Sequence, residues 1–367
     1  MITPPLRSSP ERIRRIESSG VLNQVPEDAE PAAYRDGPSF QNHEDDVDWE
    51  LEEELELEEQ GFYRGSYKRL VALYTLAPLT ALVAIVLLSL LPAFAYRCPN
   101  PHPPEYPYLP FLPFPLPELL APVALYALSY LLRAPLYALS ALLLPFPLPA
   151  ILLCTVLHTI ISTLTRLLAL ALLLVRPYAS YSYPTWHDPA FCRVWWVALG
   201  WAAAEAVVSV HQGYVGLALY QDVLVPPDLP LRDPERTPLL PTHHADSDPD
   251  IEIDHDIEQL IALKAREELE DVFGIPLVLI PAFIPCLQRI NSVLLSLGLF
   301  LLLGASLYSA NHSWLLVVLA AATHLLLAVL HAPIVLPRVG VQGAVYVGAV
   351  VSLGVLFAGL GAWGGVS

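Results

Sequence analysis

The stretch "LVALYTLAPLTALVAIVLLSLLPAFAY", residues 70–96, decides the fold class, because it runs for 27 residues without one charged side chain. A membrane-spanning helix needs about 20 consecutive apolar residues, and a soluble domain cannot bury a run of this length. Six further apolar runs lie between charged or Pro-rich breaks, at residues 118–145, 149–175, 192–220, 290–310, 313–331 and 340–363. The sequence therefore predicts an all-α, polytopic transmembrane helix bundle of about seven spans in the lipid bilayer.

The acidity of the chain belongs to two soluble segments. Of its 36 acidic residues, 17 lie in residues 1–69 and 15 in residues 221–272, which accounts for the net charge of −17. The segment 1–69 is rich in Pro, Ser and Glu and is predicted to be a disordered, acidic cytoplasmic tail. Phosphate binding needs a concentrated basic face, which the sequence lacks, so nucleic acid is excluded as a partner.

Positive charge indicates the orientation of the spans. We expect no cleavable signal peptide, because the first 60 residues are polar and lack a short apolar core. With the tail inside, nine Lys and Arg residues flank the inner ends of the spans and three flank the outer ends. This asymmetry predicts a cytoplasmic N-terminus and, with seven spans, a lumenal or extracellular C-terminus. A G-protein-coupled receptor has the opposite orientation, so seven spans do not indicate a receptor here.

The segments between the spans divide the chain into residues 1–69, 70–220, 221–272 and 273–367. In the cytoplasmic loop 221–272, an amphipathic helix is predicted at about 256–273. Its polar face is acidic, which favours docking on the protein's own cytoplasmic face over binding to anionic lipid. Residues 274–286 contain three prolines and are predicted to form a re-entrant or interfacial element, with an eighth crossing as the alternative. Because the apolar repeat follows Asp256, this residue is expected to cap the amphipathic helix.

The outer loop between the first two spans, residues 97–117, has a proline at nearly every second position. This pattern forbids a helix and favours a stiff extended segment, which is either a rigid connector or an aromatic cap over a cavity. Cys98 and Cys192 both fall at outer ends of spans in this topology. A disulfide between them would join two outer loops if that side is oxidising.

Two spans carry polar stripes at helical spacing. The stripe residues are His158, Ser162, Thr165 and Arg166 on the third span and Glu205, Ser209, His211 and Gln212 on the fourth. Unpaired charge inside a membrane costs several kcal/mol, on the order of 2.5 to 3.5 on insertion scales. Because Arg166, Arg133 and Glu205 fall at similar depths, we expect Glu205 to face one of the two arginines.

This charged cluster has two interpretations. In the first, Glu205 is a proton carrier or substrate ligand, and His158 or His211 is a relay, as in ion-coupled transporters. In the second, the cluster is a structural ion pair that fixes the register of the helices. A lone intramembrane histidine such as His324 is interpreted as a packed, hydrogen-bonded side chain.

The last span carries a face of small residues. Gly340, Ala344, Gly348 and Ser352 recur at every fourth position, which lets another backbone approach closely. Packing within the bundle is the favoured interpretation, and a homodimer interface is the alternative.

Short motifs add little chemistry. The stretch "HHADSDPDIEIDHD", residues 243–256, departs from a calcium-binding loop, so no metal or cofactor is expected. In "ERTPLL", the acid Glu235 precedes the pair Leu239 and Leu240, which is similar to sorting signals read by adaptor complexes. No nucleotide-binding loop or catalytic motif is present, so the sequence does not indicate an enzyme.

Three stretches resemble an uncharacterised family of fungal multi-pass membrane proteins. They are "GFYRGSYKRLVALYTLAPLT", "YQDVLVP" and "REELEDVFGIPLVLIPAFIPCLQRINSVLLSLG", at residues 61–80, 220–226 and 266–298. The resemblance implies a eukaryotic endomembrane, either vacuolar or lysosomal or the endoplasmic reticulum. It brings no activity, substrate or catalytic residue with it.

Three functions follow from the sequence. The first is a transporter or transport-related protein of an internal membrane, with the charged residues of the third and fourth spans on its pathway. The second is a membrane adaptor or scaffold that recruits cytosolic proteins through its acidic tail and loop. The third is an intramembrane lipid-modifying enzyme, which would require His158 or His211.

Overall fold

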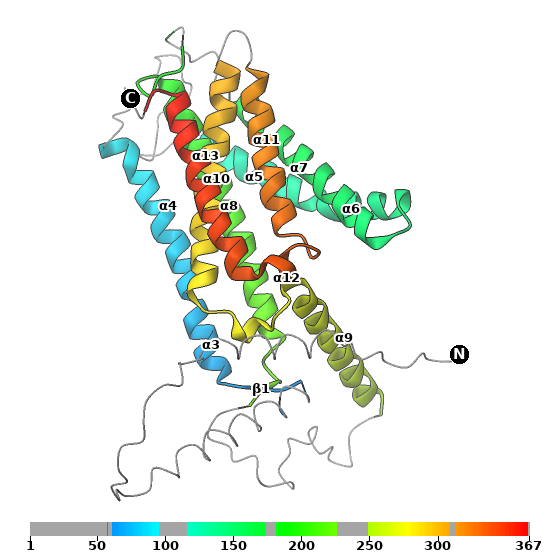
Figure 1. Cartoon of the computed structure of the whole chain (residues 1–367). Helices are drawn as coiled ribbons and strands as arrows, with labels where there is room; N and C mark the ends of the chain where they lie inside the picture. The colour runs from blue at the N-terminus through cyan, green and yellow to red at the C-terminus, as the bar shows by residue number, and fades with distance from the viewer. Residues whose placement is uncertain are drawn as a thin grey trace, which may run out of the picture. The chain divides into compact units, whose positions relative to one another are not determined.

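The described part of the chain is helical apart from two strands of two residues each. The computed structural model describes residues 57, 61–94, 116–173, 181, 183–225, 249–308 and 313–365, all in the compact unit Glu54–Ser367. Its elements are β1 (Tyr63–Arg64), α3 (Tyr67–Tyr74), α4 (Leu76–Phe94), α5 (Leu116–Leu131), α6 (Arg133–Leu143), α7 (Pro147–Leu172), α8 (Pro189–Ala218), β2 (Leu224–Val225), α9 (Pro249–Phe273), η2 (Leu277–Leu279), α10 (Phe283–Tyr308), α11 (Trp314–Leu330), α12 (Leu336–Val339) and α13 (Val341–Ala362) (Figure 1).

Among the described residues, six helices are long and apolar enough to cross a membrane. They are Tyr67–Pro92, Leu116–Leu143, Pro147–Leu172, Pro189–Ala218, Phe283–Tyr308 and Val341–Ala362. By helix length and hydropathy, the chain is a multi-pass membrane protein, which confirms the predicted fold class. The remaining predicted span, 313–331, corresponds to α11, which has 17 residues. At ~1.5 Å per residue α11 is about 25 Å long, somewhat less than the ~30 Å of a hydrocarbon core.

Prolines explain the breaks within the first two long helices. The boundary between α3 and α4 falls at Thr75, three residues before Pro78, and the boundary between α5 and α6 falls at Leu132, before Pro135. A proline lacks the amide hydrogen and its ring clashes with the carbonyl four residues earlier, which bends a helix without ending it in lipid.

Within the described residues, the Pro-rich segment 274–286 forms no separate helix long enough to cross a membrane. It forms the one-turn helix η2 and the start of α10, which begins at Phe283 and not at about residue 290. Pro285 lies in the first turn of α10. The first amide hydrogens of a helix have no partner within it, so a proline there removes no hydrogen bond.

Helix α10 is the centre of the bundle. It packs against α13, α8, α4, α11 and α7, and its ribbon overlaps those of α8 and α13 in Figure 1. In α13, the predicted face of small residues lies within the chain: Ala344, Gly348 and Ser352 are buried. The amide of Asn291 in α10 donates to the carbonyl of Val345 over 2.9 Å. Gly340 instead joins α12 to α13 with a φ of 79°, a left-handed conformation that suits glycine.

One end of the bundle, which we call the Trp363 end, is closed by aromatic packing. The Trp363 ring lies 5.6 Å from that of Phe191 and 5.4 Å from that of Tyr308. Its indole donates to the carbonyl of Leu301 over 2.9 Å, and the hydroxyl of Tyr308 donates to the carboxylate of Asp188 over 2.6 Å. These contacts join the start of α8 to the ends of α10 and α13.

Three of the four cysteines lie among the described residues. Cys154 and Cys286 are free thiols, and Cys192 is buried at the Trp363 end, in the first turn of α8. Cys98 and the rest of the outer loop 97–115 lie outside the described residues. The disulfide between Cys98 and Cys192 therefore stays a prediction.

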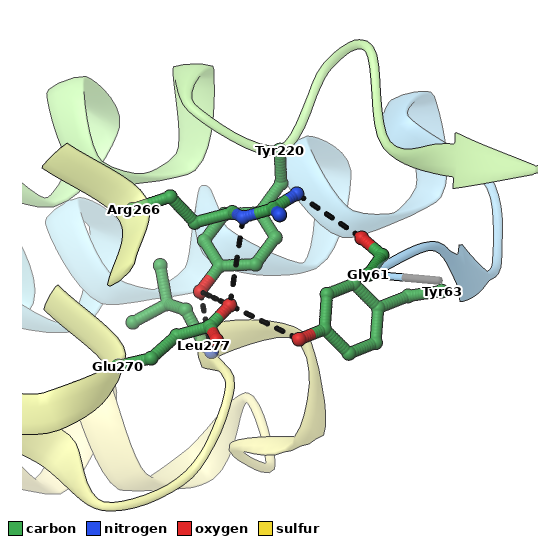
Figure 2. A network of polar contacts seen from close by, with 6 residues as sticks. All are labelled: Gly61, Tyr63, Tyr220, Arg266, Glu270 and Leu277. Carbon is green, nitrogen blue, oxygen red and sulfur yellow. Dashed lines mark hydrogen bonds and ion pairs between the residues drawn. The ribbon is translucent and has the colours of Figure 1, made fainter. Parts of the chain in front are cut away.

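The opposite end, the α9 end, is organised around the carboxylate of Glu270. Figure 2 shows one oxygen of this carboxylate accepting hydrogen bonds from the hydroxyls of Tyr63 (3.1 Å) and Tyr220 (3.0 Å), with the Arg266 Nε 3.8 Å away. Arg266 also donates to the carbonyl of Gly61 over 3.1 Å. Burial raises the pKa of the Tyr220 phenol, which keeps this hydroxyl protonated as a donor. The network fixes the C-terminal part of α9 against the segments before α3 and after α8.

Helix α9 covers the predicted amphipathic helix and begins earlier, at Pro249. Its C-terminal part docks on the protein itself, as the charge of its polar face indicated. Three of the apolar residues in the predicted stripe remain exposed: Ile257, Leu260 and Ile261. Helix α9 docks on two segments that lie side by side, because strands β1 and β2 pair in parallel. The paired residues are Tyr63 with Leu224 and Arg64 with Val225.

Replacing Glu270 by alanine is expected to release α9. Tyr220 is fully buried, so its hydroxyl proton would lose its acceptor, at a cost of about 1 to 3 kcal/mol. Limited proteolysis of the full chain in lipid nanodiscs measures this effect as faster cleavage within residues 226–273. The matched control is Glu268→Ala, since Glu268 is 71% exposed and has only a 3.9 Å pair with Lys264. Equal cleavage of both variants would contradict the anchoring role.

Candidate functional site

Two cavities whose walls combine polar and apolar residues adjoin each other in the bundle. The smaller has a volume of about 230 Å³ and lies among α8, α10, α11 and α13. The larger has a volume of about 710 Å³ and lies between α5, α6, α7 and the end of α11. His324, Ala328 and His331 line both cavities. Because these residues recur along one side of α11, this helix separates the two cavities and forms part of both walls.

The smaller cavity lies in the half of the bundle nearest the α9 end. Its walls come from the second half of α8, the first half of α10, the last turns of α11 and the first turns of α13. The polar residues among them are Glu205, Ser209, Gln288, Arg289, Asn291, Ser292, His324 and His331. The Trp363 end is filled by the aromatic packing described above. The bundle is therefore hollow at one end and packed at the other.

Glu205 is held by hydroxyl groups and not by an arginine. Ser292 and Ser296 of α10 donate to its two carboxylate oxygens, each over 2.7 Å. Within the described residues, Glu205 forms no ion pair with Arg166 or Arg133, so the predicted pair is wrong. The two serines are one helical turn apart and face the same carboxylate, which satisfies both of its oxygens without a counter-charge.

Arg166 lies behind His324, between aromatic rings. Its guanidinium carbon is 4.8 Å from the centroid of the Trp201 ring and 5.9 Å from that of Phe300. Its Nη1 lies 3.1 Å from Nδ1 of His324. An arginine only donates, so Nδ1 of His324 accepts and the proton of the neutral imidazole is on Nε2. His324 is therefore packed and hydrogen-bonded, as the sequence indicated, and it also lines both cavities.

Arg289 is a cavity-lining residue that the sequence interpretation did not place in the candidate site. It was counted as an inner flank, yet it lies in α10 and lines the smaller cavity. Its Nη2 is 3.5 Å from Oε1 of the adjacent Gln288, and its buried Nε has no hydrogen-bond partner among the described residues. The signal was "QRINS", residues 288–292, a polar cluster immediately before a long apolar run.

The structure brings together some of the predicted site residues and not others. Arg133 and His158 line the larger cavity, while Glu205 and Ser209 line the smaller one. Ser162 and Thr165 are buried, and Thr165 Oγ1 donates to the backbone of its own helix. His211 and Gln212 are exposed and line neither cavity. His211 therefore lies apart from the two cavities, and its relay role stays a prediction. His324 and His331 stand between the cavities.

Several predicted features fall on residues that the structure does not describe. The sorting motif Glu235, Leu239 and Leu240, residues 1–56 and 58–60 of the acidic tail, and the side chains of the His-rich stretch 243–256 lie outside the described residues. The end of the tail, residues 61–69, is ordered as β1 and the start of α3, so the predicted disorder is wrong there. Among the described residues, no group of three His, Cys, Asp or Glu side chains is placed to hold a metal ion.

Comparisons with known proteins identify no relative. No protein-family model matches the chain, and neither a curated protein nor a solved structure was found to be similar to it. The function is therefore argued from the cavities and their residues alone.

Proposed function

We propose that this multi-pass membrane protein is a transporter that moves a small solute through the two cavities. The observation that supports the proposal is the pair of adjoining cavities with ionisable residues in their walls, while aromatic rings pack at the Trp363 end. Intramembrane ionisable residues in proteins typically line a substrate or ion pathway. A cavity open toward one side and blocked toward the other is the arrangement that alternating access requires.

The helix arrangement is compatible with seven crossings. The starts of α8 and α5 and the ends of α7, α10 and α13 meet at the Trp363 end through the contacts of Arg193, Tyr308 and Trp363. Helix α11 runs between the same two ends, since Ser306 near the end of α10 donates to the carbonyl of Ser313 before α11. In the proposal, α11 crosses as the sixth span, and the bundle places the N- and C-terminal ends of the chain on opposite sides.

The proposal gives the sides of the membrane from the charge asymmetry. Positively charged flanks favour a cytoplasmic α9 end, so the cavities face the cytoplasm in this conformation and the Trp363 end faces the lumen. The resemblance to fungal membrane proteins and the di-leucine motif support an internal membrane, of the vacuole, lysosome or endoplasmic reticulum. A green fluorescent fusion imaged against organelle markers tests this part separately.

Within the pathway, Glu205 is the group that couples or positions the solute. It is the carboxylate in the wall of the smaller cavity, held there by the hydroxyls of Ser292 and Ser296. The histidines His324 and His331 occupy the boundary between the cavities, where a solute that passes from one to the other must contact them. The proposal assigns no catalytic step.

Filling the boundary between the cavities is expected to stop transport. Ala328 lines both cavities, so Ala328→Phe adds a ring where the solute would pass. We expect flux in proteoliposomes to fall at least about tenfold, which corresponds to ~1.4 kcal/mol on the barrier. The flux panel covers protons, read with an interior pH dye, inorganic and organic anions, cations and neutral solutes. The measurement uses wild type, Ala328→Phe and Glu205→Gln at equal reconstitution yield.

The matched control is Ala322→Phe, the same substitution on an exposed position of the same helix. We expect it to leave flux unchanged, because Ala322 lines neither cavity. If wild-type protein moves no solute of the panel, the transport proposal is wrong. If both phenylalanine variants lose flux equally, the cavities are not the pathway.

A second candidate, a membrane adaptor, is favoured by one observation. Ile257, Leu260 and Ile261 are exposed on α9, ahead of the C-terminal part that Arg266 and Glu270 anchor. An adaptor would lose its partners when residues 226–262 are deleted and would keep them in Ala328→Phe. A transporter shows the reverse dependence.

A further inference from the structure

We propose that the solute is a small anion with oxygen acceptors, a carboxylate or a phosphate, and that it binds beside Arg289 in the smaller cavity. The inference rests on the proposed function for its biological meaning. The inference itself states that the site binds a negatively charged ligand, and ligand binding can be measured without a transport assay.

The charges inside the spans favour an anion. Arg193 and Glu118 neutralise each other at the Trp363 end, where Nη2 lies 3.1 Å from Oε1 and both side chains are buried. The other charged residues of the described spans in and around the cavities are Arg133, Arg166 and Arg289 against Glu205 alone. Arg133 is exposed, so the charged groups withdrawn from solvent are Arg166 and Arg289 against Glu205, an excess of one positive charge. Because buried charge is costly unless compensated, this excess favours a negative partner.

Hydrogen bonding points to the same sign. Both oxygens of Glu205 accept from serine hydroxyls, so the carboxylate has little need for a cation. Arg289 and Arg166 each have a buried Nε without a hydrogen-bond partner among the described residues. Buried polar groups in folded proteins are nearly always paired. The unmet need in this region is therefore for acceptors, which an oxyanion supplies.

The remaining groups of the wall suit the same ligand. The Nε2 hydrogen of His324 is a second donor, fixed by the bond between its Nδ1 and Arg166. His331 does not add a donor, because its Nδ1 hydrogen is used by the carbonyl of Leu327 over 2.9 Å and its Nε2 is then an acceptor. A guanidinium binds carboxylate and phosphate oxygens in a planar, two-pronged geometry. The cavity of about 230 Å³ limits the ligand to a small molecule. The larger cavity adjoins it and carries the positive charge of Arg133 in its wall, which attracts anions.

The test measures binding to purified full-length protein in nanodiscs of neutral phosphatidylcholine. The probes are sodium phosphate and sodium succinate, compared with sodium chloride and choline chloride at equal ionic strength, and the readout is the thermal unfolding midpoint. We expect phosphate, succinate or both to raise the midpoint in a saturable way. Arg289→Gln should weaken this binding about 10- to 100-fold, as expected for loss of a hydrogen bond to a charged group. Arg338→Gln is the matched control, because Arg338 is exposed in α12 and lines neither cavity.

Gln288→Glu tests the sign of the site even if Arg289→Gln does not fold. It places a carboxylate in the wall beside Arg289, so it should weaken an anion site and strengthen a cation site. Stabilisation by choline, tighter binding in Gln288→Glu, or saturable stabilisation by neither oxyanion would each overturn the inference. Oxyanion binding without flux would support the anion site and reject the transport proposal. Flux of another solute without oxyanion binding would support transport and reject the anion site.

Discussion

Replacing Gly298 by leucine is expected to prevent the chain from folding. At this position α10 and α13 approach so closely that a Cβ atom on Gly298 would lie 2.6 Å from the amide nitrogen of Leu356 and 2.7 Å from the carbonyl carbon of Val355. These are backbone atoms, which no change of rotamer moves aside. Even alanine requires the two helices to separate, and overpacking of this kind costs roughly 1 to 3 kcal/mol or more. Leucine adds three further carbons at the same contact.

The control is Gly354→Leu. Gly354 lies in α13, one residue before Val355, and is exposed, with no atom within 4 Å of an added Cβ. The two variants thus carry the same substitution and differ in whether the glycine faces α10. The measurement is the fraction of protein that elutes as a single species after extraction, followed by its thermal unfolding midpoint. A Gly298→Leu protein as stable as Gly354→Leu would show that the α10–α13 contact does not limit the fold.

The positions of the helices could be predicted from the sequence because lipid imposes one simple constraint. A segment without charge that is long enough to cross must be a helix, since its backbone groups find no water. The runs 118–145 and 340–363 correspond to Leu116–Leu143 and Val341–Ala362, within a few residues. The start of α10 was missed because prolines were taken as breaks. A proline is tolerated in the first turn of a helix but not in its interior. Telling the two cases apart requires the position at which the helix begins, and the sequence does not give that position.

The partners of the charged residues could not be predicted in the same way. Position along an apolar run gives the depth of a residue in the membrane, but not the direction in which its side chain leaves the helix relative to its neighbours. Arg166 and Glu205 therefore seemed matched by depth alone. In the structure, Glu205 faces Ser292 and Ser296, and Arg166 faces His324 and Trp201.

Helix boundaries also decided which residues counted as part of the site. With a span beginning at 290, Arg289 was a cytoplasmic flank and supported the orientation. With α10 beginning at Phe283, the same residue lies two turns inside the helix and lines a cavity. Removing it from the inner flanks leaves eight positive residues against three, so the predicted orientation does not depend on it.

Replacing Glu118 by leucine is expected to destabilise the Trp363 end by about 3 to 5 kcal/mol, the cost of leaving one member of a buried ion pair without its partner. The charge that remains is that of Arg193, which is 3.1 Å from Glu118 in the folded protein, with side-chain exposures of 7% and 5%. Its Nη1 also donates to the carbonyl of Leu173 over 3.0 Å, so the arginine is held in place and cannot easily turn toward water. The measurement is the thermal unfolding midpoint in nanodiscs, with helical content checked by circular dichroism.

The double variant Glu118→Leu with Arg193→Met separates the charge from the packing. If the loss in Glu118→Leu comes from the uncompensated guanidinium, removing that charge as well should recover more than half of it, because an apolar pair of similar size is often as stable as a buried ion pair. If the double variant is as unstable as Glu118→Leu alone, the unpaired charge does not cause the loss of stability. The cause is then the lost hydrogen bond to the carbonyl of Leu173 or poorer packing of α5 against α8. Recovery would mean that the ion pair between Arg193 and Glu118 contributes little net stability. A functional role would then explain the pair at the Trp363 end better than stability does. One such role is a contact that breaks when this end of the bundle opens.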